Sequence, residues 1–229
     1  QIVVVKKYLS LLADATRVIL CSGNHDLDDR SAEGEKIARW ISEVRELGIV
    51  CDGDNLTVGD TLFTVCPWWD GPLVKQRLDT QLREAAINRP NRWIWVHHAP
   101  PANSPTSWGG KRFFGDVELV QWIERHQPSI VISGHVHQSP FITDGSWFDR
   151  IGATWVFNAG LQPGRPPTYV VLDIDESTAF WLAAGHEQCV DLNAPLQRPA
   201  ARIANPPPWL TSLDRIAGPI PAKPASAAS

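Results

Sequence analysis

Three short polar segments of the chain each follow directly on an apolar, strand-like run. The polar segments are Gly23-Asn24-His25-Asp26, His97-His98-Ala99-Pro100 and Gly134-His135-Val136-His137, and the apolar runs are residues 17–21, 93–96 and 130–133. In α/β folds, ligand sites gather at the carboxyl ends of strands. We therefore expect these three loops to converge on one site.

The Gly134-His135-Val136-His137 segment has the spacing of a metal-binding histidine pair. In an extended backbone, residues i and i+2 point to the same side and lie about 6–7 Å apart at a rise of ~3.3 Å per residue. Two ions in a dinuclear hydrolase lie ~3.5–4 Å apart, and Zn–N bonds are ~2 Å long. His135 and His137 can therefore each bind one ion of a pair. A pair of solvated surface histidines is the alternative interpretation.

The Gly23-Asn24-His25-Asp26 segment offers a different set of groups. The side-chain oxygen of Asn24 is a hard metal ligand, and His25 is able to exchange a proton near neutral pH. Asp26 is placed to orient the imidazole. The alternative is an Asx turn, in which Asn24 and Asp26 cap backbone amides.

The three segments, in this order and each after an apolar strand, resemble the calcineurin-like metallophosphoesterase family from residue 1 to about residue 190. The resemblance implies two divalent ions (Mn, Fe, Zn or similar), a shared carboxylate, and a metal-activated water that hydrolyses a phosphomonoester or phosphodiester. It implies that Asn24, His97 and His135 bind one ion and that His137 helps to bind the other. His25 is then expected to protonate the leaving oxygen or to stabilise the transition state, with Asp26 orienting it.

The adjacent histidines leave one assignment open. The family ligand falls at the end of the strand, which favours His97, with His98 as the alternative. A metallo-β-lactamase type of site is a weaker interpretation, because its HxHxDH pattern does not continue after His137.

The family also has an Asp-x-His and a Gly-Asp motif upstream of GNHD, and the residues before Gly23 contain neither. Asp14 is the sole carboxylate there. Because the chain also starts at Gln1 and has no methionine, we expect a missing N-terminal strand–helix unit of about 40–60 residues. The competing hypothesis is a catalytically inactive, shortened remnant that serves as a metal-binding or interaction module.

Composition restricts the partners. A net charge of −4 without a basic run gives no sign of a nucleic-acid groove, and no apolar stretch reaches the ~20 residues of a membrane span. Four scattered cysteines predict free thiols and a cytoplasmic location. We expect a small-molecule or nucleotide phosphate as substrate.

Helical spacing alternates with apolar runs early in the chain and gives way to strands later, which predicts an α/β fold. The expected helices include residues 32–47, and the expected late strands are residues 153–158, 169–173 and 178–183. By resemblance, we expect two mixed β-sheets packed face to face between helices in four layers. The domain is expected to cover residues 1–192, and the Pro/Ala-rich residues 193–229 are expected to be a tail. Loops at residues 68–72 and 107–112 are candidate pocket walls, and Lys111, Arg112 or Arg165 are candidate phosphate ligands.

Overall fold

The structure, a computed structural model, describes residues 2–87, 89–162, 167–204 and 206–210. Its helices are α1 (Ile2–Ala15), α2 (Arg39–Glu43), α3 (Pro72–Ile87) and α4 (Val117–His126), with 3₁₀ turns η1 (Val44–Leu47), η2 (Pro105–Ser107) and η3 (Ser139–Phe141). The strands in the first two thirds are β1 (Ile19–Leu20), β2 (Asp29–Arg30), β3 (Lys36–Ile37), β4 (Val50–Cys51), β5 (Asn55–Val58), β6 (Thr61–Val65), β7 (Arg92–Val96) and β8 (Ile130–Ser133). Those that follow are β9 (Phe148–Ile151), β10 (Thr154–Asn158), β11 (Tyr169–Asp173), β12 (Thr178–Ala183), β13 (His186–Asp191) and β14 (Ala201–Arg202).

A six-stranded sheet forms the centre of the molecule, in the order β5-β6-β7-β8-β10-β9. Strands β6, β7, β8 and β10 are parallel to one another, whereas β5 and β9 are antiparallel edges. The four parallel strands therefore end at the same edge of the sheet. The loops that follow them lie next to each other there.

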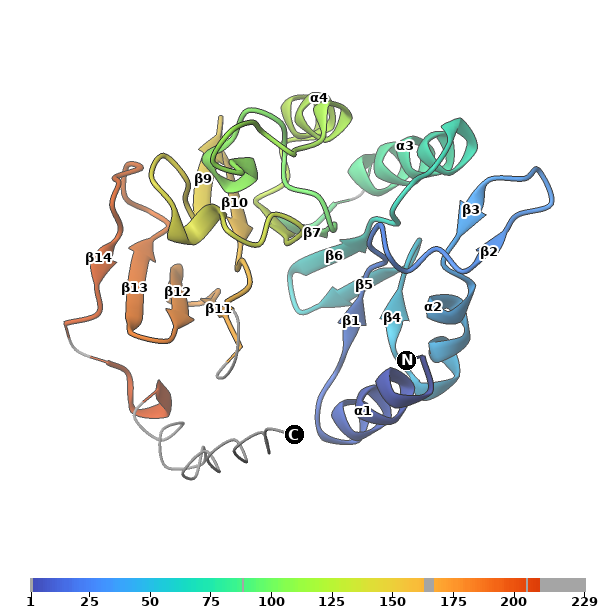
Figure 1. Cartoon of the computed structure of the whole chain (residues 1–229), viewed down its shortest axis with the longest axis horizontal. Helices are drawn as coiled ribbons and strands as arrows, with labels where there is room; N and C mark the ends of the chain where they lie inside the picture. The colour runs from blue at the N-terminus through green and yellow to red at the C-terminus, as the bar shows by residue number, and fades with distance from the viewer. Residues whose placement is uncertain (1, 88, 163–166, 205, 211–229) are drawn as a thin grey trace, which may run out of the picture.

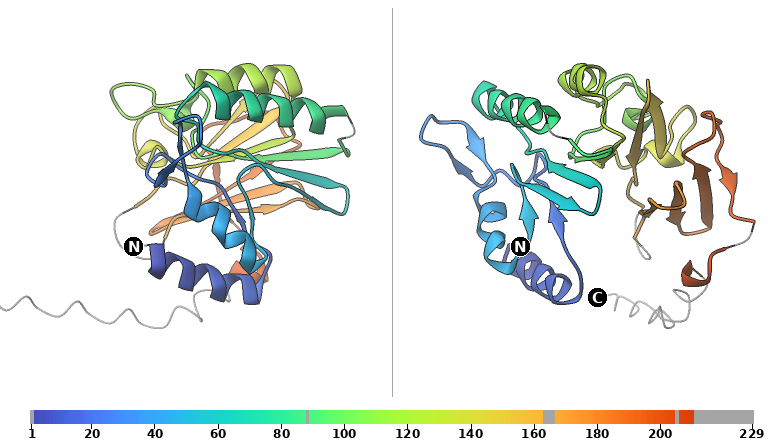
Figure 2. Two further views of the ribbon diagram at one scale, coloured as in Figure 1. Left: turned by 90° about the vertical axis from the view of Figure 1, so that its right-hand side faces the viewer. Right: turned by 180° about the vertical axis from the view of Figure 1, so that it is seen from behind.

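The two faces of this sheet are covered differently (Figures 1 and 2). Helices α3 and α4 cover one face, where Leu78, Leu82 and Ile123 pack against Trp93 and Trp95. The antiparallel sheet β11-β12-β13-β14 covers the other face. Each large apolar side chain that is fully buried in such a core contributes about 1.5–3 kcal/mol.

A smaller unit stands beside the six-stranded sheet in Figure 1. Strands β1 and β4 pair in parallel, and α1, α2 and η1 pack around them over a core that includes Leu9, Ile41 and Cys51. The β2–β3 hairpin connects this unit to α3, because Glu35 accepts hydrogen bonds from the first free amides of that helix. The small unit therefore has its own core and a polar link to the main body.

The predicted fold class is confirmed: several β-sheets are flanked by helices in an α/β arrangement. The helix expected over residues 32–47 starts later, at Arg39, because residues 29–37 form the β2–β3 hairpin. Strands β9, β13 and β14 were not predicted.

The expected boundary at residue 192 is wrong for the residues that directly follow it. Strand β14 pairs with β13, Arg198 forms an ion pair with Asp149, and Leu196 packs on the core between the sheets. Leu210 is also buried. The rest of the predicted tail, residues 211–229, lies outside the described residues. Among the described residues, no helix is long and apolar enough to cross a membrane.

Candidate metal centre

Three polar side chains from three different loops meet at the carboxyl ends of β1, β7 and β8. The Nε2 atom of His98 lies 3.0 Å from Oδ1 of Asn24 and 3.2 Å from Nδ1 of His135. The His98 and His135 rings have their centroids 5.0 Å apart. The predicted convergence of the loops is confirmed for these residues.

The loop after β1 is shaped by a turn of its own. The carboxylate of Asp26 accepts a hydrogen bond from the amide of Gly23 (2.8 Å), and the amide of Asp26 donates to the Gly23 carbonyl (3.1 Å). A Cβ atom on Gly23 would lie only 2.8–2.9 Å from the ring atoms of His98. Glycine is therefore required there to let the His98 ring reach Asn24. Asp26 therefore holds this turn, but its bond runs back to the preceding Gly23 amide and is not that of the expected Asx turn.

The loop after β8 differs from the expectation. Strand β8 ends at Ser133, His135 has φ +67°, and the Val136 amide donates to the Gly134 carbonyl over 2.7 Å. This is a γ-turn centred on a non-glycine residue, a strained conformation that is often found at functional sites. The expected extended backbone across His135 and His137 is wrong, because the strand has already ended.

Asn158, the last residue of β10, fixes this loop and was missed by the sequence analysis. It is fully buried, and its side-chain amide donates to the carbonyls of Thr106 (2.8 Å) and Val136 (3.0 Å) and reaches Ser139 Oγ at 3.0 Å. A polar residue that ends an otherwise apolar strand was the available signal. Asn158 therefore fixes the backbone next to His135, because it binds the carbonyl of Val136.

The preference for His97 over His98 is not supported by the geometry. His97 is 1% exposed, its ring stacks on Trp69 at 4.7 Å and 6°, and its Nδ1 lies 3.3 Å from the carbonyl of Cys66. Adjacent residues in extended backbone point to opposite sides. Because the His97 amide still donates to Ile132 in the sheet, His97 points into the core and His98 points to Asn24 and His135.

His25 and His137 are exposed at the margin of this cluster. Both act electrostatically on His98 and His135, so they belong to the same surface. Burial is the main cause that lowers the pKa of His98 to about 4, with positive charge on His135, His137 and His25 adding to it. Burial also lowers the pKa of His135. Both imidazoles are therefore neutral at physiological pH, which is the form that binds metal ions.

Aromatic side chains form the walls of the cluster. The Trp68 ring has its centroid 5.6 Å from those of both His98 and His135, and its amide is held by Ser22 Oγ. Phe114 and His135 also line a small cavity of about 180 Å³. Arg112 is exposed and stacks over the Phe114 ring at 4.6 Å. Lys111 is exposed in the same loop, and Arg165 lies outside the described residues.

Neutral nitrogen and oxygen donors that converge at strand ends define an α/β protein with a candidate metal centre. Residues 3–139, more than half of the chain, match the family model of the calcineurin-like phosphoesterases. The chain belongs to this family of phosphoester hydrolases, which typically use divalent metals.

One of three similar solved structures supports the fold. One crystal structure superposes with a TM-score of 0.54 at 13% identity, over 82% of this chain and 70% of that chain. The protein TT1561 of Thermus thermophilus superposes with a TM-score of 0.38 at 16% identity, over 67% of this chain and 65% of its own. Purple acid phosphatase PPD1 from yellow lupin (Lupinus luteus) seeds gives 0.42 and 13%, over 76% of this chain and 38% of its own. Only the first bears on the fold, and no curated protein sequence matches this chain.

Within residues 2–87, 89–162, 167–204 and 206–210, no group of three or more His, Cys, Asp and Glu side chains is arranged to hold a metal ion. The set formed by Asn24, His98 and His135 has two histidines and relies on an amide oxygen for its third donor.

Proposed function

We propose that Asn24, His98 and His135 bind one divalent ion of a centre that hydrolyses phosphate esters. The observation that carries this proposal is the double contact of His98 Nε2 with Asn24 (3.0 Å) and His135 (3.2 Å). A neutral imidazole nitrogen offers either one proton or one lone pair in the plane of its ring. Nε2 therefore cannot form a good hydrogen bond to both neighbours, whereas an ion between the three atoms would use all of them.

The distances suit this interpretation. Two ligand atoms that bind one ion over bonds of ~2.0–2.2 Å lie roughly 2.8–3.6 Å apart for angles between 90° and the tetrahedral value. The two measured separations, 3.0 and 3.2 Å, fall in this interval. Nitrogen and oxygen donors without thiolate suit Zn, Mn, Fe or Mg.

An ion bound there would polarise a phosphoryl oxygen and lower the pKa of a bound water. The residues of the chain have separate tasks. His25, exposed beside the cluster, donates a proton to the leaving oxygen, and Trp68 limits the access of bulk water to His98 and His135. Arg112, stacked on Phe114 next to His135, binds a non-reacting phosphate oxygen of a small-molecule or nucleotide substrate.

A second ion, with His137 among its ligands, belongs to the same proposal. The part of the chain that the structure describes does not provide the further carboxylates that such an ion needs. This observation favours a second candidate function, metal binding without hydrolysis.

Calorimetric titration with Co²⁺ and Mn²⁺ tests the first ion independently of activity. We expect one saturable site in the wild-type chain and none in His98→Ala or Asn24→Ala. Equal affinity in all three proteins would contradict the assignment. Hydrolysis of bis(p-nitrophenyl) phosphate and p-nitrophenyl phosphate by the metal-loaded chain then separates the two candidate functions, since the second predicts binding without turnover.

A further inference from the structure

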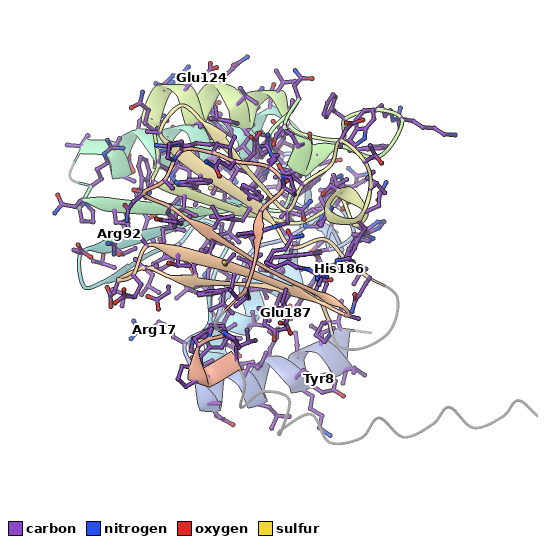
Figure 3. All side chains as sticks on the ribbon, turned by 90° about the vertical axis from the view of Figure 1, so that its left-hand side faces the viewer. Tyr8, Arg17, Arg92, Glu124, His186 and Glu187 are labelled. Atoms are coloured by element: carbon purple, nitrogen blue, oxygen red, sulfur yellow. The ribbon has the colours of Figure 1, made fainter. Side chains whose placement is uncertain are left out.

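A second cavity, of about 450 Å³, lies at the amino ends of the parallel strands. It opens between the six-stranded and the four-stranded sheets, since its walls include residues that precede β7 and β8, the β9–β10 turn and the β11–β12 turn. Figure 3 shows its wall residue Arg92 at the end of the molecule opposite to His186. The His186 ring contacts Phe141, which follows the loop of His135. The cavity is therefore remote from the metal centre.

The cavity is lined by more positively charged than negatively charged side chains. Three arginines, Arg89, Arg92 and Arg150, line it together with a single carboxylate, Asp60. The cavity thus carries an excess of two positive charges in a chain whose net charge is −4. Asp60 compensates Arg92 only weakly, because the ion pair is 3.6 Å long and the Asp60 side chain is 61% exposed.

The main evidence for a bound anion is the environment of Arg150. Its guanidinium lies 5.3 Å from the centroid of the Trp155 ring, its cross-strand neighbour, and its Nε atom is buried without a hydrogen-bond partner. No ion pair of Arg150 occurs among the described residues, whereas Arg45, Arg125 and Arg198 each contact a carboxylate. A buried, unsatisfied donor on a charged group is destabilising, and an anion would remove that penalty.

Arg89 and Ser129 add further donors. Arg89 binds only neutral groups, the carbonyls of His126 and Gln127 at the end of α4. Ser129 Oγ accepts a hydrogen bond from the Trp93 amide, which leaves its hydroxyl proton for a ligand. The donors come from separate walls of the cavity. A tetrahedral oxyanion with oxygens in several directions matches them better than a planar carboxylate does.

We propose that this cavity is a binding site for a phosphate group, free or esterified, that is separate from the metal centre and independent of its activity. Arg150 provides the forked guanidinium contact, and Arg92 and Arg89 provide charge from the other walls. Guanidinium forks bind phosphate through paired charge-assisted hydrogen bonds, which lysine cannot reproduce.

The test is calorimetric titration with inorganic phosphate at constant ionic strength, in a His98→Ala background so that the metal centre does not contribute. We expect a saturable site with a Kd of about 1 mM or lower. Arg150→Gln should weaken it at least about tenfold. Arg202→Gln, which changes an exposed arginine of β14 outside the cavity, is the matched control and should leave the affinity unchanged.

Arg150→Lys keeps the charge and removes the fork, so it should bind phosphate more weakly than the parent while retaining its fold. If Arg150→Gln does not fold, Arg150→Lys and Arg92→Gln carry the test, with far-ultraviolet circular dichroism as the check. No saturable phosphate binding in the His98→Ala background would overturn the proposal. An equal loss in Arg202→Gln, or binding of succinate in preference to phosphate and sulfate, would overturn it as well.

Discussion

A single methyl group on Gly23 should separate the three donors of the candidate metal centre. A Cβ atom there would lie 2.8 Å from Cε1 of His98 and 2.9 Å from both ring nitrogens. Ordinary carbon contacts are about 3.5–4.0 Å long, so in Gly23→Ala the ring must move by roughly 0.7–1.2 Å. The ring would then lose its position against Asn24, whereas ligand distances in metal sites are fixed to within about 0.2 Å.

We expect Gly23→Ala to weaken Co²⁺ binding about tenfold to a hundredfold, which corresponds to about 1.4–2.7 kcal/mol. Gly134→Ala is the matched control, because a Cβ atom there meets nothing closer than the His98 carbonyl at 4.0 Å. Neither glycine has a left-handed φ, so the comparison isolates the steric effect. Calorimetry measures affinity, and urea unfolding confirms that both variants fold. Wild-type affinity in Gly23→Ala, or an equal loss in Gly134→Ala, would refute this reasoning.

Three further predictions follow from the site and the core. His98→Phe should abolish Co²⁺ binding while His97→Phe retains it; calorimetry showing the reverse order would restore the sequence-based assignment. Asn158→Ala removes a buried amide that contacts three buried acceptors and leaves the Thr106 carbonyl without this donor, so urea unfolding should show a loss of about 2–3 kcal/mol; unchanged stability would contradict that role. Burial, with Arg125 nearby, lowers the pKa of His126, so the unfolded chain binds more protons and stability falls as the pH drops through about 6.5. In urea titrations from neutral pH to pH ~5.5, His126→Phe should lose less stability than the wild type, and parallel curves would count against the assignment.

Strands with continuous apolar runs could be predicted from the sequence almost to the residue. The bounds of β8, β11 and β12 agree with the expected runs, because each strand is mostly apolar and none of its residues is exposed. Strand β13 was missed, since His186, Glu187, Gln188 and Asp191 make it polar. Its pairing with β12 provides the stability that its own sequence does not indicate.

The site could be predicted as three loops but not as a set of atoms. Which of His97 and His98 points to Asn24 depends on the register of β7 against β8, which local sequence does not specify. The γ-turn at His135 was not predictable either, because non-glycine residues rarely adopt a positive φ and the turn depends on the remote Asn158.

The candidate centre joins two independently packed parts of the fold. Asn24 follows β1 of the small unit, whereas His98 and His135 follow strands of the six-stranded sheet, and the two parts have separate cores. Loosening of the small unit alone would therefore pull one donor away while the large sheet stays folded. An ion held by all three residues would link the two parts. Its removal should therefore lower the temperature at which the small unit unfolds and Asn24 separates from the two histidines.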